Sequence, residues 1–407
     1  MLKPTVLHGS HNYYIPGGAE RYFFELSGLL EQHNHKVIPF CGASERNHPT
    51  EYAAYFPPAV DTANPSLTDV FRFIYSRDAR QHIERAIDDL QPNIAHLHIY
   101  HGKLTSSILA PLKKRHIPIV QTLHEYKLLC PVYSCIRHGE ICESCQGKYF
   151  WKALTNRCNR GSIARSAVSC AESYVAKMLG AVDNIDHFIG VSQFMTDKML
   201  SIGVPEEKIT TVHNFVDCDK LRPADSPGNY ILYFGRLDAT KGLFTLLDAM
   251  RANPNLDCVL AGSGPDEAKL TAYAADNNIT NVRFAGFATG NALQELIRGA
   301  VCTVLPAEWY ENCPMSVLES LAYARPVIGT RIGGIPELVD HGQDGLIVEP
   351  ANAEQLAAAL EELGSNPEKA RQMGQVGREK VARDFSPAQH YQQIKAVYEK
   401  LPGVAAW

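Results

Sequence analysis

Residues 302–330 read CTVLPAEWYENCPMSVLESLAYARPVIGT, and this stretch decides the fold class. An apolar run at 302–307 is followed by a polar loop, a helical stretch that begins near Pro314, and a second apolar run at 326–330. Proline suits the first turn of a helix, where its missing N–H would have no partner, and Asn312 is a candidate N-cap. Strand, helix and strand in this order predict a parallel sheet with a helical crossover.

The same alternation extends in both directions along the chain. Because 407 residues exceed one ordinary core, the length favours two domains. We expect the first series of strands at 37–40, 94–99, 118–124, 187–192 and 209–214, and the second at 230–236, 256–264, 282–287, 302–307, 326–330 and 345–350. The pattern predicts an α/β fold of two Rossmann-like, doubly wound domains.

The domain limits follow from local composition. Residues 221–229, LRPADSPGN, are polar and rich in Pro and Gly, as linkers are, so we expect one domain over 1–220 and the next over 221–385. The segment FSPAQ breaks the helical end of the chain, which leaves a last helix within 386–407. Ligands of such sheets bind beyond the carboxyl ends of the strands, so we expect the loops of the two domains to line a central cleft.

Composition excludes several classes of protein. Hydrophobic residues make up 45% of the chain and the net charge is −5, which argue against disorder and against a nucleic-acid binder. No apolar stretch approaches the roughly 20 residues of a membrane-spanning helix, and the N-terminus lacks a signal core. Eleven cysteines, several in apolar runs, indicate reduced thiols. We therefore expect a cytoplasmic protein.

An insert at about 127–170 combines positive charge with cysteines. It holds seven basic and two acidic residues, so it faces either an anionic acceptor or membrane surface, or simply water. Three interpretations of its cysteines stay open: a structural zinc site, a redox-sensitive knot, or reduced thiols in a lid or acceptor loop. The cysteines concerned are Cys130, Cys135, Cys142, Cys145, Cys158 and Cys170.

Candidate binding residues cluster at the predicted strand ends of the second domain. Glu311 and Glu319 bracket a helix start, where carboxylates and free N–H groups suit a ligand rich in hydroxyl and phosphate oxygens. In YFGRLDATKG, Arg236 and Lys241 follow a strand, and two fixed cations there can neutralise a departing diphosphate. Such cations would replace a magnesium ion, so we expect neither a metal nor another cofactor.

Two candidate features lie in the first domain. Gly17 and Gly18 precede an amphipathic helix, so the backbone there can approach an anionic group. His124 ends a strand, where we expect its imidazole to face the cleft; Glu125 follows it.

The segment from Glu311 to Glu319 resembles the E-x7-E motif of the retaining glycosyltransferase family 4, which has the GT-B fold. The resemblance covers nearly the whole chain and is most specific over 230–348. It implies that Glu311 contacts the donor sugar and Glu319 the nucleotide's ribose. It also implies that the backbone amides of Asn312 and Cys313 bind sugar hydroxyls.

The resemblance assigns the other candidates as well. It implies that Arg236 and Lys241 bind the pyrophosphate and that Gly17 and Gly18 face the phosphates or the acceptor. His124 then lies near the donor sugar, and the final helix crosses back to the first domain. The partners implied are a nucleotide sugar and a saccharide or lipid-linked acceptor, with peripheral association at the inner membrane surface as a hypothesis.

Other motifs do not support a different chemistry. The loop AGSGP at 261–265 lacks the third glycine of a dinucleotide fingerprint, which argues against a nicotinamide enzyme, and the sequence contains no P-loop motif. The metal-binding pattern D-x-D occurs at 217–219, but next to the linker, so we interpret it as interdomain structure.

Three alternatives to a transferase stay open. A sugar-nucleotide epimerase or phosphorylase would share the fold, and a noncatalytic sensor would bind the donor without a new glycosidic bond. An interaction protein regulated by metal or redox state would depend on the cysteine insert. The E-x7-E pattern favours transfer. The resemblance implies that configuration is retained, and front-face substitution is the mechanism usually proposed for the family. Double displacement would require a carboxylate nucleophile, and the sequence alone does not identify one.

Overall fold

The computed structural model describes residues 3–224 and 228–404, which form two compact units. The first comprises residues up to 213 together with those from 391 onward, and the second comprises 214–390. The limits predicted from sequence were 220/221 and 385/386. The predicted linker 221–229 therefore begins inside the second unit, and its residues 225–227 lie outside the described part of the chain.

The first unit contains a six-stranded parallel sheet in the order β2-β1-β3-β4-β7-β8. Its strands are β1 (Val6–Ser10), β2 (Val37–Cys41), β3 (Ile94–Leu97), β4 (Ile119–Leu123), β7 (His187–Gly190) and β8 (Ile209–Thr211). Strand β1 was not predicted, because His8, Gly9 and Ser10 interrupt its apolar run, yet all five of its residues are buried between β2 and β3.

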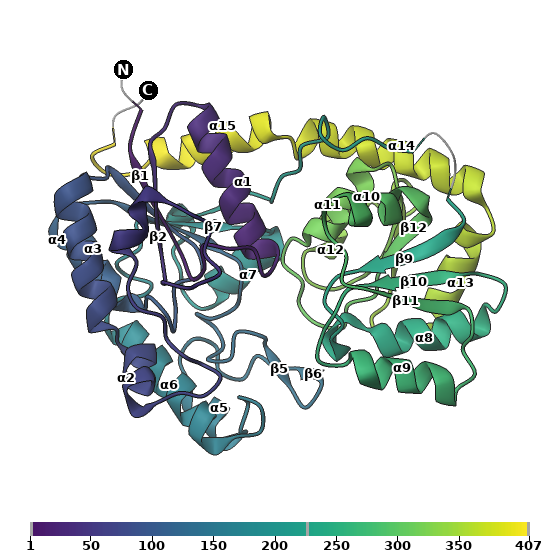
Figure 1. Ribbon diagram of the computed structural model, residues 1–407, viewed down its shortest axis with the longest axis horizontal. Helices are drawn as coiled ribbons and strands as arrows, with labels where there is room; N and C mark the ends of the chain where they lie inside the picture. The colour runs from purple at the N-terminus through teal and green to yellow at the C-terminus, as the bar shows by residue number, and fades with distance from the viewer. Residues whose placement is uncertain (1–2, 225–227, 405–407) are drawn as a thin grey trace. The chain divides into compact units, whose positions relative to one another are not determined.

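Helices cover this sheet, and their limits follow local rules. Ser76 caps α3, where its Oγ accepts a hydrogen bond from the N–H of Ala79, and the helix ends at Gln91 in the left-handed region. Figure 1 shows α15 beside α1, where the Tyr391 ring stacks on His33. The helices of this unit are α1 (Gly18–Gln32), α2 (Leu67–Ile74), α3 (Arg77–Leu90), α4 (Leu109–Lys114), α5 (Trp151–Thr155), α6 (Ile163–Met178), α7 (Gln193–Ser201) and α15 (Pro387–Glu399), the last beginning four residues before the unit boundary.

The second unit contains another six-stranded parallel sheet, in the order β11-β10-β9-β12-β13-β14. Its strands are β9 (Tyr230–Phe234), β10 (Cys258–Ala261), β11 (Val282–Gly286), β12 (Ala300–Leu305), β13 (Val327–Thr330) and β14 (Gly345–Val348). Its helices are α8 (Leu243–Ala252), α9 (Glu267–Asp276), α10 (Gly290–Gly299), α11 (Met315–Ala322), α12 (Ile335–Leu338), α13 (Ala353–Gly364) and α14 (Pro367–Asp384). The prediction of two doubly wound α/β domains is confirmed.

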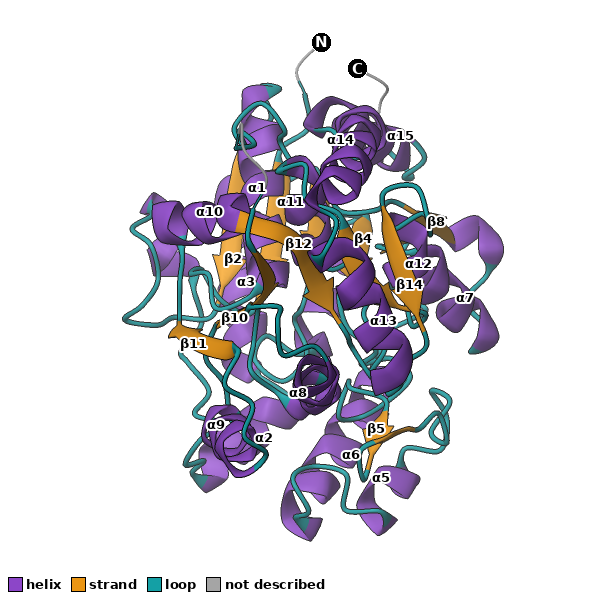
Figure 2. Cartoon of the chain, turned by 90° about the vertical axis from the view of Figure 1, so that its right-hand side faces the viewer, coloured by secondary structure: helices purple, strands orange, loops and turns teal. Residues whose placement is uncertain are grey.

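The cysteine-rich insert forms a small substructure of its own. The hairpin of β5 (Ile136–Arg137) and β6 (Glu140–Ile141), which was not predicted, lies apart from the large sheets near α5 and α6 (Figure 2). The N–H of Cys142 donates to the carbonyl of Cys135 at 2.7 Å across its base. All eleven cysteines, each within the described residues, are free thiols.

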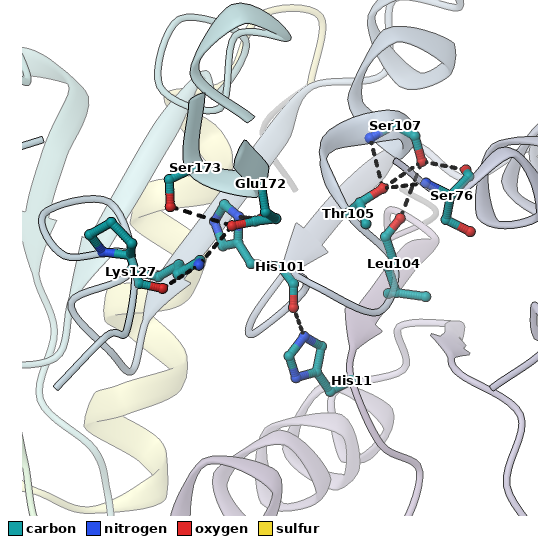
Figure 3. Close-up of polar contacts among 10 residues, drawn as sticks. His11, Ser76, His101, Leu104, Thr105, Ser107, Lys127, Glu172 and Ser173 are labelled. Carbon is teal, nitrogen blue, oxygen red and sulfur yellow. Dashed lines mark hydrogen bonds and ion pairs between the residues drawn. The ribbon is translucent and has the colours of Figure 1, made fainter. Parts of the chain in front are cut away.

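A buried charged cluster joins the start of the insert to α6 (Figure 3). The Glu172 carboxylate is 1% exposed and lies 2.7 Å from the Lys127 ammonium and 3.3 Å from Nδ1 of His101. Lys127 also donates to the carbonyl of Pro131 at 2.6 Å. Burial alone would raise the pKa of Glu172, but Lys127 and His101 outweigh it and lower the pKa to about 2.

Hydroxyl groups connect the start of α3 to a short 3-10 helix, Ser106–Ile108. Thr105 accepts from the N–H of Ser76, and Ser107 donates to the carbonyl of Ser76 at 2.7 Å (Figure 3). These bonds satisfy backbone groups at the start of α3 that would otherwise be buried without partners. Throughout the described ranges, no helix combines the length and the apolar character needed to cross a membrane.

Replacing Glu172 should destabilise the first unit in a pH-dependent way. A folded-state pKa below the unfolded value of 4.5 stabilises the fold above pH 4.5, and that contribution is lost as the pH falls toward 2. We expect Glu172→Gln to lower the free energy of unfolding by roughly 3 kcal/mol at pH 7. Urea unfolding between pH 7 and 3.5 measures the difference, which should shrink below pH 4.5.

The matched control is Glu362→Gln, because Glu362 lies in a surface pair with Lys369. Its effect should stay within about 0.5 kcal/mol at every pH. A Glu172→Gln difference that is independent of pH would contradict the assigned ion pair.

Candidate functional site

Both sheets reverse their strand order next to their first strand. The order changes between β1 and β3 in the first unit and between β9 and β12 in the second. At such a point the flanking loops leave in opposite directions, and ligands bind beside the carboxyl ends of the two strands. Most of the residues predicted from sequence lie in the loops at these two positions.

The loop after β9 is held in a tight turn. The Asp238 carboxylate accepts from the N–H and the hydroxyl of Thr240, at 3.1 and 2.8 Å. Gly242 has φ +68°, and a Cβ there would lie 1.8 Å from the carbonyl oxygen of Pro306. Only glycine fits this position, and the turn directs Lys241 toward the loop after β12.

Lys241 and Glu311 meet at the switch point of the second sheet. The ammonium of Lys241 forms an ion pair with the Glu311 carboxylate, which also accepts from the indole N–H of Trp309 at 2.7 Å. The ammonium lies 4.8 Å from the centre of the Trp309 ring. The Lys241 side chain is 18% exposed and that of Glu311 is 9%, so water screens this pair little.

The backbone of Glu311 is fixed by the loop after β13. Gly334 donates its N–H to the Glu311 carbonyl at 2.7 Å. Gly333 has φ +58°, and a Cβ there would lie 2.0 Å from the same oxygen. This loop was not predicted to belong to the site, although its two adjacent glycines after an apolar strand are a sequence signal for close backbone approach.

The helix between the two glutamates begins differently from the prediction. Pro314 occupies the N-cap position, α11 begins at Met315, and Asn312 makes no capping hydrogen bond, so that prediction was wrong. The backbone of Pro314 is extended, at φ −66° and ψ 119°, and therefore does not start the helix. Glu319 lies in the second turn of α11 and is buried.

Cys313 is buried against the first residue of the second unit. Its carbonyl accepts from the Asn214 side-chain amide at 2.8 Å, and its sulfur accepts from the Asn214 N–H. These contacts hold the loop before α11 in a defined position.

Arg236 is the most exposed of the predicted cations, with a 65% exposed side chain 3.6 Å from the Asp238 carboxylate. Its carbonyl accepts from the Tyr233 hydroxyl at 2.7 Å. The loop AGSGP packs against this segment, since the N–H of Leu237 donates to the carbonyl of Ser263. The loops after β9 and β10 therefore form one backbone layer.

The D-x-D pattern at 217–219 contacts α14. The Asp217 carboxylate pairs with Lys220, and the carbonyl of Cys218 accepts from Arg378 of α14 at 2.9 Å. The second contact ties the segment to α14.

In the first unit, Gly17 and Gly18 are exposed where α1 begins. His124 follows β4, is half-buried, and packs edge-on against Tyr22. Its imidazole lies 2.9 Å from that of His98, within the first unit. Burial lowers the pKa of His124 to about 3, so this ring stays neutral at physiological pH.

The pKa of Glu125 is shifted in the opposite direction from that of Glu172. Its carboxyl group has no hydrogen-bond partner in the part of the chain that the structure describes, and burial raises its pKa to about 7, against the lowering effect of Lys127. A small cavity of about 10 Å³ lies beside it, lined in part by His98, His101 and His124. That is room for about one water.

Sequence reasoning missed a group of histidines at the first switch point. His8 lies on β1, with His96 and His98 at the end of β3, and their nitrogens lie within 4.8 Å of one another. A signal was present in IAHLHIYH, where histidines recur at a strand end. Among the described residues, no three thiols of the insert approach one another this closely.

Two family models match the chain. Residues 16–220, half of the chain, match "Glycosyltransferase Family 4", and residues 220–380 match "Glycosyl transferases group 1". A curated relative, glycogen synthase of Mycobacterium tuberculosis, is 28% identical over 236 residues, which are 55% of each chain. The chain thus spans about half the length of these curated relatives.

Solved structures match over nearly the whole length. A sucrose-phosphate synthase from Thermosynechococcus elongatus superposes with a TM-score of 0.73 over 98% of both chains, at 19% identity. Anabaena HepE in complex with UDP-glucose superposes with a TM-score of 0.66 over 97% of this chain and 99% of that one, at 17% identity. These likenesses establish the GT-B fold, and with the family models they lead to one conclusion: the chain belongs to glycosyltransferase family 4.

Proposed function

We propose that this protein transfers a sugar from a nucleotide-diphosphate donor to a hydroxyl group of an acceptor. The observation that carries the proposal is the pairing of Lys241 with Glu311 at the switch point of the second sheet. A sugar offers hydroxyl donors and a diphosphate offers negative oxygens, and this pair supplies one partner for each. Family membership and the E-x7-E spacing of Glu311 and Glu319 support the same function.

The ion pair also stabilises the two charged groups that form it. An isolated carboxylate as buried as Glu311 would be costly, and Lys241 compensates it. When a donor binds, its hydroxyls can donate to Glu311 while its diphosphate takes Lys241 as a counter-ion. Arg236, being exposed, can turn toward the same phosphates.

The proposed chemistry needs no divalent metal, because the two cations neutralise the charge on the leaving group. The acceptor oxygen bonds to the anomeric carbon as the bond from that carbon to the phosphate oxygen breaks. The acceptor proton passes to the departing phosphate, and the nucleoside diphosphate leaves from the face that the acceptor attacks. Configuration is then retained, and the protein contributes positioning and electrostatic stabilisation.

The relatives support the substrate classes. HepE was solved with UDP-glucose, and a glycogen synthase is named among the relatives, so we propose a nucleotide sugar as donor and a saccharide or lipid-linked saccharide as acceptor.

A cytoplasmic location at the inner membrane face stays a prediction. The first unit has side chains suited to contact with a membrane, because exposed apolar residues occur on α2 and on the insert, and exposed cations occur on the insert. They are Leu67, Phe71, Trp151 and Ile163, with Lys148, Arg157 and Arg160.

Donor binding tests the site directly. We expect calorimetry in EDTA to detect one of a panel of UDP-, GDP- and ADP-sugars, with affinity falling at least tenfold in Lys241→Ala and Glu319→Ala. Lys369→Ala and Glu362→Ala, which alter a surface pair on the same unit, should bind as wild type. Circular dichroism establishes that each variant is folded, since Lys241→Ala leaves Glu311 without its cation.

Absence of binding by folded wild-type protein would contradict the proposal. Product analysis then separates a transferase from a sensor, because only the transferase joins the sugar to an added saccharide.

We expect the ionised carboxyl group of Glu125 to lower the free energy of unfolding at high pH. Because its folded-state pKa of about 7 exceeds the unfolded value of 4.5, its contribution is most favourable below pH 4.5 and is lost as the pH rises through 7. We expect Glu125→Gln to raise the free energy of unfolding by about 2 kcal/mol at pH 8 and to change it little at pH 4.5. Urea unfolding at the two pH values measures this.

The control is Glu140→Gln, since Glu140 is exposed in the β5–β6 hairpin. It should have no effect at either pH. An equal effect of Glu125→Gln at both pH values would show that the carboxyl group does not titrate as assigned.

Membrane association can be tested through the exposed apolar residues. We expect wild-type protein to sediment with vesicles that contain anionic phospholipid, and Phe71→Ser with Trp151→Ser to reduce the bound fraction several-fold. Phe287→Ser removes a side chain that is 75% exposed in the second unit and should change nothing. Equal sedimentation with neutral and anionic vesicles would exclude a role for the basic insert.

A further inference from the structure

A chain of hydrogen bonds runs through the interior of the first unit and ends at His124. Nδ1 of His8 lies 2.8 Å from Oγ of Ser27, and Nε2 of His8 lies 2.5 Å from Nε2 of His98. Nδ1 of His98 then lies 2.9 Å from Nε2 of His124. His8 and His98 are buried; His8 lies in the middle of β1, whereas His98 and His124 directly follow β3 and β4.

All three rings are neutral. Burial is the main cause in each case: it lowers the pKa of His8 and of His124 to about 3, and that of His98 well below its usual range. A neutral imidazole carries one N–H and one lone pair. Each link in the chain therefore needs a donor on one side and an acceptor on the other.

Ser27 fixes the direction of the chain. Oγ of Ser27 lies 2.9 Å from the carbonyl oxygen of Phe23 and 2.8 Å from Nδ1 of His8. We infer that its single hydroxyl hydrogen is donated to the Phe23 carbonyl, so that its oxygen accepts from Nδ1–H of His8. Nε2 of His8 is then unprotonated and accepts from Nε2–H of His98.

The same rule applies at the last link. Nδ1 of His98 is unprotonated and accepts from Nε2–H of His124. The proton of His124 is thereby held on Nε2, and its Nδ1 carries the lone pair.

We propose that Ser27, His8 and His98 are positioning residues that hold His124 in the tautomer whose Nδ1 is a hydrogen-bond acceptor. Such a nitrogen takes an O–H group, as on a sugar, and does not take a phosphate oxygen, which has no proton to donate. The choice of a sugar hydroxyl rests on the proposed function, and the tautomer rests on donation of the Ser27 hydroxyl hydrogen to the Phe23 carbonyl.

A metal ion is the rival explanation for this histidine cluster, because His8, His96 and His98 lie close enough to share one. Both nitrogens of every ring already have a partner, however. Nδ1 of His96 lies 2.8 Å from the Tyr398 hydroxyl, and its Nε2 lies 2.7 Å from that of Thr122. The lone pairs that a metal would need are used in hydrogen bonds.

The tautomers can be read by long-range ¹H–¹⁵N NMR on protein labelled at histidine, with signals assigned from single His→Gln variants. We expect Nδ1 to be protonated in His8, and Nε2 to be protonated in His98 and His124. The spectra are recorded on the free protein, so the result does not depend on transferase activity. A protonated Nδ1 on His124 would overturn the proposal.

Ser27→Ala tests whether Ser27 determines which nitrogen of each histidine in the chain is protonated. Without the serine oxygen, Nδ1–H of His8 would be a buried donor without an acceptor, which is costlier than a buried lone pair. We expect the chain to reverse, so that a protonated Nδ1 appears on His124, whose half-buried ring can donate to water. Unchanged His124 signals in this variant would overturn the proposal.

His98→Phe supplies a second, independent measurement. It keeps a buried ring but removes the middle link, so adding Ser27→Ala should then alter His8 and leave His124 unchanged. His187→Phe is the matched control, because His187 is buried in the same sheet and bonds to Thr210 outside the chain. One equivalent of metal in the purified protein, lost in His96→Phe, would also overturn the assignment.

Discussion

The structure depends on one constraint, that all main strands of each unit run parallel. Carboxyl ends then collect at one edge of a sheet, and a crevice opens only where the strand order reverses. His8 and His98 flank that point in the first unit, and Lys241 and Glu311 follow the two strands that flank it in the second. Residues distant in sequence meet there because the topology brings the ends of the first and a later strand together.

Desolvation decides which polar groups these positions can hold. The second unit compensates a buried carboxylate with an ammonium and an indole N–H. The first unit compensates Glu172 with Lys127 and His101, which lowers the pKa of Glu172, whereas Glu125 lacks a hydrogen-bond partner in the described structure and has a raised pKa. Two glutamates of one unit thus differ in pKa because their partners differ. A carboxyl group with a raised pKa reduces stability once it ionises.

The sequence predicted what depends on local pattern and missed what depends on tertiary burial. Apolar runs located eleven of the twelve strands of the two large sheets, but β1 escaped because His8, Gly9 and Ser10 look polar until their neighbours bury them. The spacing of Glu311 and Glu319 was visible, whereas the ion pair with Lys241, 70 residues away, needed the fold. Asn312 was a reasonable cap by residue type, yet the extended backbone of Pro314 took that place.

The two switch points differ in charge, and this difference follows from the groups each can stabilise. Anionic oxygens need fixed positive charge, which Lys241 and Arg236 supply at one of them. Neutral hydroxyls need directed acceptors, and an imidazole works as one only while it is uncharged and in a single tautomer. Burial removes the charge from His8, His98 and His124, and in the proposed chain the hydroxyl of Ser27 selects the tautomer. A lone exposed histidine at a strand end would be neither held neutral nor held in one tautomer. The buried rings of His8 and His98 therefore contribute to the hydrogen bonding of His124.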